Sequence, residues 1–380
     1  MRIGKKFIGA LALLTAVVCL LTGCGPTGAP EASTPYGTAE PSHMELRYAE
    51  QFTVDYYDDG ALITIGGTDR YFLVSEGSEP PEGLDADIVL IHRPIRGLYL
   101  AASSAMDHFI QLDALDQVCF TSTMLTNWGL PEVRTAMEDE SIIYVGKYSA
   151  PDFEVLLSEG CGLTVESTMI YHSPETQEML ESLGIPVLVE RSSYESHPLG
   201  RVEWIKLYGL LIGREAEAEA FFDEQVRLLE ELDTLPADGQ TVAFFHINTV
   251  GAAVVRRPGD YVTKLIELAG GRYVFSELED SSDGTMSTLT MQMEAFYTGA
   301  RDADVLIYNS TIDGELETLD QLLQKSSLLA DFKAVQNGNV WCTEHDMFQK
   351  STAAAGMTAD LNAILSGTDE DTLEFFHRLK

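Results

Sequence analysis

The chain has 380 residues, a length that predicts about two domains. Hydrophobic residues make up 45% of it and charged residues 22%, which is typical of a globular protein and argues against a largely disordered chain. Lys and Arg number 24 against 60 Asp and Glu, so the net charge of −36 argues against general binding to nucleic acid or to anionic membrane surfaces.

The first 23 residues are typical of an export signal. Three basic residues near the start precede an apolar run over 7–21, which is shorter than the ~20 residues that a membrane-spanning helix needs. The run ends in Leu21-Thr22-Gly23-Cys24, which resembles a bacterial lipobox. That resemblance implies that Cys24 is lipidated and becomes the first mature residue; the alternative is an ordinary signal peptide followed by a chance Cys.

Residues 24–45 are rich in small residues and Pro, and they predict a flexible tether. An N-terminal α/β lobe is expected over 46–213. It starts with a hairpin of strands 52–57 and 61–65 around the turn Asp58-Asp59-Gly60. Strands then alternate with helices, which predicts a mostly parallel sheet covered on both faces. The expected strands are 88–91, 118–120, 142–145, 163–165 and 186–189, and the expected helices are 98–115, 131–137, one beginning at Pro151, and 174–183.

The longest helical pattern follows, with apolar residues at helical spacing over 214–233. Such a helix is ~30 Å long, so a connecting helix over 214–236 is expected to act as a strut between two lobes. The alternative is an ordinary crossover helix within one sheet. A C-terminal α/β lobe is expected over 237–380, with strands 242–245, 305–308 and 340–342 as the last, a helix over 261–268 and another beginning at Glu294. The predicted fold class is therefore α/β, with two lobes of mostly parallel sheet joined by one long helical strut.

The sequence contains no nucleophile elbow, P-loop or H-E-x-x-H motif, and no His lies at metal-ligand spacing from another His or a Cys. A catalytic site assembled from distant segments stays open. Cys119, Cys161 and Cys342 remain after the signal; they allow one disulfide at most, or three buried thiols.

Aromatic and Arg side chains gather after the predicted strands, where open α/β sheets bind ligands. Such a set predicts a pocket for a large, flat or anionic small molecule. For each aromatic residue the alternative is simple packing, and for the adjacent Arg pair it is a solvated surface. The candidate ligand-binding residues are Arg93, Trp128, Tyr148, Tyr171, Tyr194, Arg256, Arg257 and Phe348.

Together these features resemble the substrate-binding lipoproteins of ABC importers, in the class that handles iron–siderophores, haem and cobalamin. The resemblance covers roughly 80–365. It rests on the order of the segments 146–154, 183–187, 207–220 and 258–271 along the chain, in addition to the lipobox, the two lobes and the strut. Residues 46–80 fit less well.

The resemblance implies a lipid-anchored, extracytoplasmic, monomeric binding protein that captures a metal chelate and delivers it to an ABC permease and its ATPase. It implies no catalysed reaction, no cofactor or metal of the protein's own and no nucleic-acid partner. It also implies that one Glu near a helix start in each lobe docks into Arg pockets of the permease, and Glu154 and Glu294 match those positions. The alternative is that both are acids favoured by the helix dipole.

The Arg candidates favour an anionic or carboxylate-bearing chelate over a bare metal ion. Two rival functions stay open: an exported enzyme with an active site between the lobes, and an adhesin or signalling lipoprotein without a transported ligand.

Overall fold

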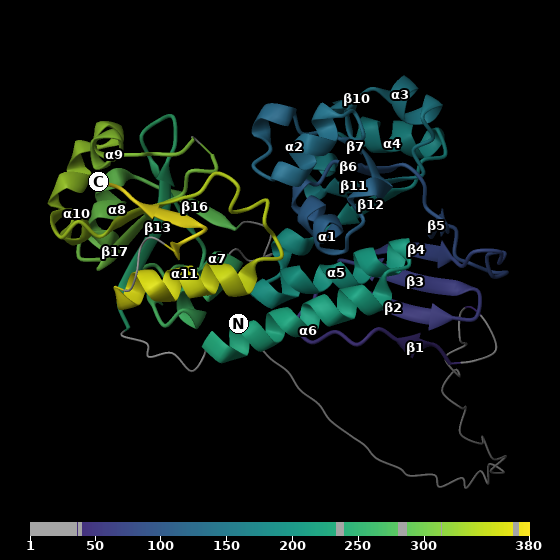
Figure 1. The fold of residues 1–380 in the computed structure, drawn as a ribbon, viewed down its shortest axis with the longest axis horizontal. Coiled ribbons are helices and arrows are strands. Elements are labelled where there is room, and N and C mark those ends of the chain that lie inside the picture. The colour runs from purple at the N-terminus through teal and green to yellow at the C-terminus, as the bar shows by residue number, and fades with distance from the viewer. Residues whose placement is uncertain (1–35, 37–39, 233–238, 280–286, 313, 368–371) are drawn as a thin grey trace, which may run out of the picture.

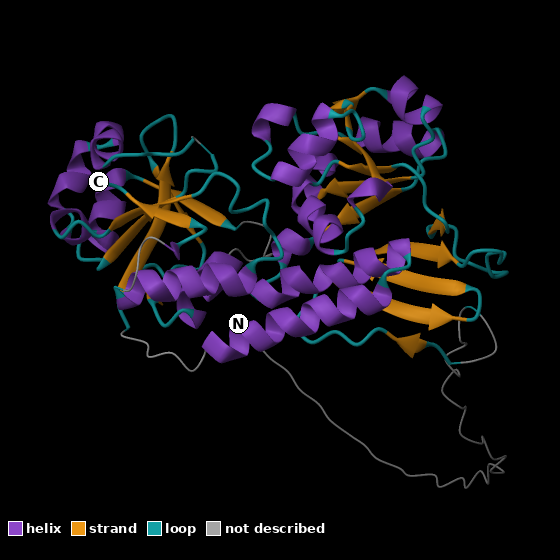
Figure 2. Cartoon of the chain, viewed as in Figure 1, coloured by secondary structure: helices purple, strands orange, loops and turns teal. Residues whose placement is uncertain are grey.

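The computed structural model describes residues 36, 40–232, 239–279, 287–312, 314–367 and 372–380. Two α/β lobes stand side by side on a layer of long helices, and a separate, mostly antiparallel sheet lies at one end of that layer (Figures 1 and 2). The predicted signal peptide, Cys24 and most of the tether lie outside the described residues.

The N-terminal lobe is built on a five-stranded parallel sheet in the order β12-β11-β6-β7-β8. Its strands are β6 (Leu98–Leu100), β7 (Val118–Thr121), β8 (Ile143–Tyr144), β11 (Leu163–Ser167) and β12 (Val187–Glu190). Its helices are α1 (Met106–Gln111), α2 (Pro131–Glu138), α3 (Phe153–Ser158) and α4 (Pro174–Ser182), and a short ribbon pairs β9 (Gly146–Lys147) with β10 (Ala150–Pro151).

The prediction of a helix over 98–115 is wrong in its first part, because α1 spans only Met106–Gln111. Residues Leu98–Leu100 form β6, the middle strand of the sheet, and the helix α1 begins only at Met106. All three residues of β6 are buried because the strand has neighbours on both edges and cover on both faces. A short apolar run of this kind has no polar face, so its periodicity does not distinguish a strand from a buried helix.

The predicted hairpin belongs to a larger sheet in the order β1-β2-β3-β4-β5. Its strands are β1 (Ser42–His43), β2 (Phe52–Tyr57), β3 (Gly60–Ile65), β4 (Asp69–Val74) and β5 (Val89–His92). The pairs from β1 to β4 are antiparallel, whereas β4 and β5 are parallel. The strand expected at 88–91 therefore completes this additional sheet and takes no part in the parallel sheet of the lobe.

The lobes are connected by a helical hairpin of α5 (Pro198–Ile212) and α6 (Glu215–Leu232), which together form the strut. The single helix predicted over 214–236 corresponds to α6. Gly213 ends α5 with a φ of 76°, a left-handed conformation that glycine adopts without strain. Helix α6 confirms the predicted long helix and returns the chain beneath the second lobe, where α11 (Ala354–Ser366) packs against it (Figure 1).

The C-terminal lobe is built on a mixed sheet in the order β16-β14-β13-β17-β18-β19, with β15 also pairing with β13. Strands β13, β17 and β18 are parallel, and the outer strands β14, β16 and β19 are antiparallel to their neighbours. The strands are β13 (Thr241–Ile247), β14 (Ala253–Arg256), β15 (Arg272–Tyr273), β16 (Thr288–Met291), β17 (Val305–Tyr308), β18 (Val340–Thr343) and β19 (Phe376–Arg378); the helices are α7 (Tyr261–Leu268), α8 (Met293–Ala300), α9 (Leu319–Lys325), α10 (Lys333–Gln336) and α11. The expectation that β18 is the last strand is wrong, because β19 follows it and pairs with it.

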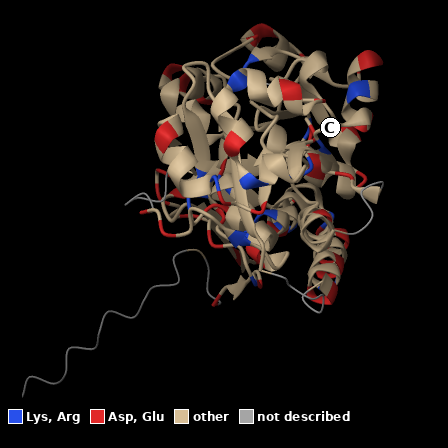
Figure 3. Cartoon of the chain, turned by 90° about the vertical axis from the view of Figure 1, so that its left-hand side faces the viewer, with Lys and Arg blue, Asp and Glu red and all other residues tan. Residues whose placement is uncertain are grey.

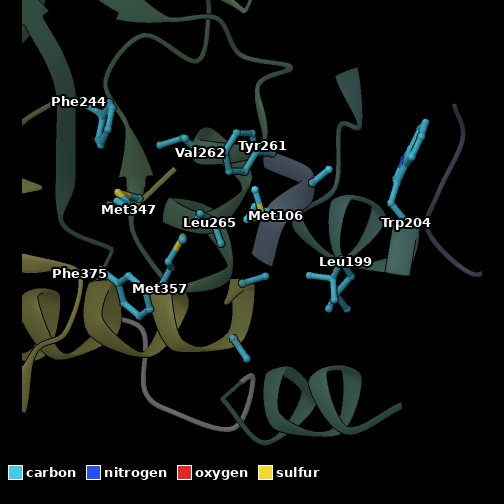
Figure 4. Close-up of a cluster of buried hydrophobic side chains, with 14 of the residues drawn as sticks. Met106, Leu199, Trp204, Phe244, Tyr261, Val262, Leu265, Met347, Met357 and Phe375 are labelled. Carbon is cyan, nitrogen blue, oxygen red and sulfur yellow. The ribbon is translucent and has the colours of Figure 1, made fainter. Parts of the chain in front are cut away.

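One hydrophobic core continues from the additional sheet through the strut into the C-terminal lobe. Figure 4 shows part of it, where Met106 of the N-terminal lobe and Leu199 of α5 lie among side chains of the C-terminal lobe. Polar contacts reinforce this junction. The Gln349 side chain accepts a hydrogen bond from the Gly129 N–H at 2.8 Å and donates one to the Asn127 carbonyl at 2.8 Å. The lobes are therefore joined by packing and hydrogen bonds as well as by the chain connection.

Two buried carboxylates hold the segment that leads from the tether into the fold. Glu203 of α5 accepts hydrogen bonds from the backbone N–H groups of residues 47, 48 and 49 at 2.8–3.0 Å. Glu195 accepts from those of residues 50 and 51 at 2.8 and 3.0 Å. Lys206 lies 3.2 Å from Glu203 and balances its charge inside the protein. Five consecutive backbone donors are thus fixed to α5 and to the loop just before it.

Acidic residues are spread over the surface rather than gathered in one patch, and Figure 3 shows them on most helices of the visible side. Of the helices in the described part of the chain, none is both long and apolar enough to cross a membrane.

Candidate functional site

A cleft of about 410 Å³ opens between the two lobes, at the first turn of α5. Its volume falls in the range of about 300–1,000 Å³ that is typical of small-molecule sites. The lining comes from both lobes and from the strut: Ala102, Ser103, Ser104, Ser167, Thr168, Met169, Glu190, Ser193, Arg201, Arg256, Asp260, Tyr261, Ser287 and Phe348.

The wall from the N-terminal lobe is built at the carboxyl ends of three parallel strands. Ala102 follows β6, Ser167 ends β11 and Glu190 ends β12. The Glu190 carboxylate accepts hydrogen bonds from the Ser104 hydroxyl at 2.9 Å and the Ser192 N–H at 2.7 Å. This wall therefore presents mainly hydroxyl groups, in the position that open α/β sheets use for ligands.

The wall from the C-terminal lobe carries charge and aromatic surface. Arg256 ends β14, and its Nη1 lies 3.3 Å from the Asp260 carboxylate, which also caps α7 by accepting from the Val262 N–H at 2.9 Å. The Arg256 guanidinium also lies 4.8 Å from the centre of the Phe348 ring. Packing and the ion pair thus fix this guanidinium at the edge of the cleft.

The floor is formed by Arg201 of α5, which is 5% exposed. Its guanidinium carbon lies 4.1 Å from the centre of the Tyr261 ring. Burial raises the pKa of the Tyr261 phenol, although the charges of Arg201 and Arg256 oppose the rise, so the phenol stays protonated at neutral pH. Arg201 and Tyr261 therefore offer the cleft a cation and a hydroxyl group.

Two of the eight predicted ligand-binding residues, Arg256 and Phe348, line this cleft. Arg257, the neighbour of Arg256, lies outside it, because its Nε and Nη1 donate to the carbonyls of Thr288 and Glu279 at 3.2 and 2.7 Å. The adjacent Arg pair is thus divided between a cleft position and a structural one.

Arg93 lies away from the cleft, and its placement corrects the sequence-based prediction. It follows β5, which belongs to the additional sheet, so the carboxyl end of that strand does not face the cleft. Its guanidinium instead pairs with Glu215 of α6 at 2.8 Å and donates to the Leu210 carbonyl. Arg93 therefore ties the additional sheet to the strut.

Trp128 and Tyr148 are also outside the cleft lining. The Trp128 ring is 1% exposed in the main core, and its indole N–H donates to the Thr123 carbonyl at 3.2 Å. Tyr148 packs against a second hydrophobic core, separate from the main one, on one face of the N-terminal sheet. For these two residues the packing alternative fits the structure.

Tyr171 and Tyr194 are also outside the cleft lining. The Tyr171 hydroxyl donates to Asp69 of β4 at 3.0 Å, and the Tyr194 hydroxyl lies 3.0 Å from the hydroxyl of the cleft residue Thr168. Burial raises the pKa of Tyr171 to about 12, with Asp69 adding to the rise. Tyr194 therefore contacts a residue of the cleft wall, whereas Tyr171 connects the segment after β11 to the additional sheet.

The sequence-based prediction missed Arg201, Tyr261 and the serines of the cleft. Serines are common in loops and carry no specific signal. Arg201 did carry one, because it is a basic residue inside a helix that is apolar on all sides.

The two predicted docking residues are exposed in the first turns of helices in different lobes, Glu154 in α3 and Glu294 in α8. Helix α3 is capped by Asp152, which accepts from the N–H groups of Glu154 and Val155 at 3.1 Å. The cap is thus supplied by Asp152, so the Glu154 side chain is not needed for it.

A second hollow of about 420 Å³ lies on the C-terminal lobe beside β15. Its charged groups are already engaged: Glu267 pairs with Lys264, Asp302 with Arg301, and Arg272 donates to the Gly239 carbonyl. The cleft is therefore the stronger candidate site.

The remaining groups of chemical interest are the thiols and the side chains that could bind a metal ion. Cys119, Cys161 and Cys342 are free thiols, so none of them forms a disulfide. Within the described ranges, no group of three or more His, Cys, Asp or Glu side chains is placed to hold a metal ion.

Comparison with known proteins identifies the class that this architecture defines. The family model for periplasmic binding proteins matches residues 118–346, and the chain belongs to this family. Two uncharacterized lipoproteins of Methanocaldococcus jannaschii are similar in sequence. One is 23% identical, covering 80% of this chain and 77% of the relative; the other is 24% identical, covering 88% and 87%.

Solved structures show the same fold. The periplasmic haem-binding protein HutB of Vibrio cholerae is 20% identical, with a TM-score of 0.56 and coverage of 68% of this chain and 96% of that protein. A periplasmic haem-binding protein of Pseudomonas aeruginosa is 15% identical, with a TM-score of 0.57 and coverage of 75% and 98%. An ABC transporter substrate-binding protein of Listeria monocytogenes is 14% identical, with a TM-score of 0.55 and coverage of 72% and 100%. The chain therefore has the two-lobed fold of ABC transporter substrate-binding proteins.

Proposed function

We propose that this protein is a lipid-anchored, extracytoplasmic binding protein that captures an anionic metal chelate and delivers it to an ABC permease and its ATPase. An iron–siderophore, haem or a corrinoid is the expected type of cargo. The protein itself holds the cargo without chemical change.

The cleft between the lobes is the observation that carries this proposal. It combines the volume of a small-molecule site with a guanidinium stacked on an aromatic ring, Arg256 on Phe348. A planar guanidinium binds carboxylate or catecholate oxygens and stacks on flat ligands. The net charge of −36 opposes anions at long range, but a Debye length of about 8 Å at physiological salt screens remote carboxylates more than a contacting Arg.

Delivery requires a defined orientation on the permease. Glu154 and Glu294 are exposed on separate lobes that the strut and the shared core hold together. Two carboxylates at a fixed separation suit charge-assisted hydrogen bonds with Arg residues of a partner. We propose that they set this orientation.

The Arg256→Gln variant is expected to lose at least tenfold in affinity for the cargo. One charge-assisted contact contributes about 1.5–3 kcal/mol, and about 1.4 kcal/mol corresponds to a factor of ten. Intrinsic Trp fluorescence titration with the anionic chelates haem and ferric enterobactin measures it, and ferrioxamine and cobalamin, which carry no net negative charge, are titrated for comparison. The matched control is Arg257→Gln, which removes the same charge one residue away and is expected to leave affinity unchanged. Equal affinities for wild type and Arg256→Gln would contradict the proposed site, and no binding of any of the four would contradict the cargo class.

The Cys24→Ala variant is expected to appear in the medium or as unprocessed precursor, because lipobox processing needs the thiol. Cell fractionation followed by immunoblotting measures this outcome. A variant that is still processed and retained in the membrane would exclude the lipid anchor.

A further inference from the structure

We propose that Arg201 is the primary anchor for an anionic group of the ligand, supplied by the strut helix rather than by either lobe. The inference rests on the proposed binding function and names the residue that holds the anionic group of the ligand. Arg201 lines the floor of the cleft and is 5% exposed.

The charges inside α5 leave Arg201 without a counterion. Residues 198–211 of this helix are all buried, and its charged residues are Arg201, Glu203 and Lys206. Glu203 and Lys206 pair with each other at 3.2 Å, and Lys206 also lies 3.0 Å from Glu219 of α6. Among the described residues, no carboxylate oxygen lies within 4.0 Å of the Arg201 guanidinium, the distance that defines an ion pair. The buried Nε of Arg201 donates no hydrogen bond.

The other ionisable groups of the cleft are already engaged. Asp260 balances the charge of Arg256 through one oxygen and caps α7 through the other, so this pair offers the cleft hydrogen-bond donors but no net charge. The Glu190 carboxylate accepts hydrogen bonds from the Ser104 hydroxyl and the Ser192 N–H. Burial lowers the pKa of His108, which lies beside the Arg201 backbone with its Nε2 3.1 Å from the carbonyl, so its ring is neutral at neutral pH and adds no charge. Within the described part of the chain, Arg201 is thus the cleft cation without an ion-pair partner, and Glu190 is the cleft carboxylate whose hydrogen bonds come from neutral donors.

Burying a guanidinium that has no ion pair and an unbonded Nε is costly, and contact with the Tyr261 ring offsets only part of the lost solvation. A bound anion repays that cost. The Tyr261 ring covers one face of the guanidinium, which leaves its edges for bidentate hydrogen bonds. Arg201 also lies in the first turn of α5, where the helix dipole favours negative charge. The ligand group is therefore a planar or tetrahedral oxyanion, such as a carboxylate, a catecholate or a phosphate.

Metal-free citrate and inorganic phosphate test this anchor without a chelate or a permease. Isothermal titration in chloride buffer is expected to show that wild type binds at least one of these anions, and that Arg201→Gln weakens the binding at least tenfold. Arg257→Gln is the matched control and is expected to bind like wild type, because its guanidinium is held by carbonyls outside the cleft. Arg201→Lys keeps the charge without the fork of donors, and an intermediate affinity is expected for it.

If Arg201→Gln fails to fold, judged by its urea unfolding curve, Arg201→Lys decides: an affinity equal to that of wild type overturns the proposal. The absence of binding of either anion to wild type also overturns it. A second titration with haem and ferric enterobactin separates this inference from the proposed function. Equal chelate affinity in wild type and Arg201→Gln refutes the anchor and leaves the function standing. Binding of the free anion at Arg201 without binding of any chelate refutes the proposed cargo and leaves the anchor standing.

Discussion

Replacing Glu203 with Ala is expected to lower the free energy of unfolding by about 3–5 kcal/mol, as is usual when one partner of a buried ion pair is removed. The carboxylate accepts from three consecutive backbone N–H groups and pairs with Lys206, and its side chain is fully buried. Its loss leaves three donors and an ammonium group inside the protein without this acceptor. Urea unfolding of the wild type and the variant measures the difference.

Glu219→Ala is the matched control, because Glu219 pairs with the same Lys206 at 3.0 Å but is 53% exposed. Exposed ion pairs contribute about 0–1 kcal/mol, so this variant is expected to unfold near the wild-type midpoint. A loss below 1 kcal/mol for Glu203→Ala would show that the segment over 47–51 is not held by this carboxylate.

Replacing both Glu154 and Glu294 with Ala is expected to reduce uptake of the cargo at least tenfold in cells, while ligand affinity stays unchanged. Each carboxylate is expected to contribute a charge-assisted contact of about 1.5–3 kcal/mol to docking. Both side chains are exposed, so the cost to stability is expected to stay within about 0.5 kcal/mol. Uptake of radiolabelled iron chelate and fluorescence titration of the purified variant measure the two effects.

The matched control for docking is the double variant Glu159→Ala and Asp302→Ala. It removes the same charge from exposed positions of the same two lobes, at the end of α3 and just after α8. Uptake at the wild-type rate is expected for this control. If the Glu154 and Glu294 variant also transported at that rate, both residues would be ordinary helix-start acids, favoured by the dipole alone.

Much of the fold is predictable from local signals. The turn Asp58-Asp59-Gly60 located the β2–β3 hairpin, and an apolar pattern between Asp260 and Gly270 gave α7 with its observed bounds. Strand β17 was likewise predicted over its full length because it is a short, fully buried apolar run. These elements are defined by residues close together in the sequence.

Features that depend on distant partners were not predictable. Strand β5 looks like any buried strand, and only its pairing with β4 places Arg93 outside the cleft. The role of Arg201 depends on which carboxylates surround it, and those lie on α5, α6, β12 and α7. Arg256 ends β14 and Phe348 lies in the loop after β18, and both line the cleft. Because β14 is antiparallel to β18, they do not reach it from one shared carboxyl edge of the sheet, as the prediction assumed.

Native mass spectrometry can show whether the cleft holds a small molecule. The secreted form of the protein, made without residues 1–23, is incubated with a cell-free culture extract, purified and weighed together with whatever it retains. We expect one small molecule per chain, carrying a metal and an acidic group, that is present on the wild type and on Arg257→Gln but lost from Arg256→Gln. A protein that retains no small molecule, or a molecule retained equally when the cleft is altered, would contradict this expectation.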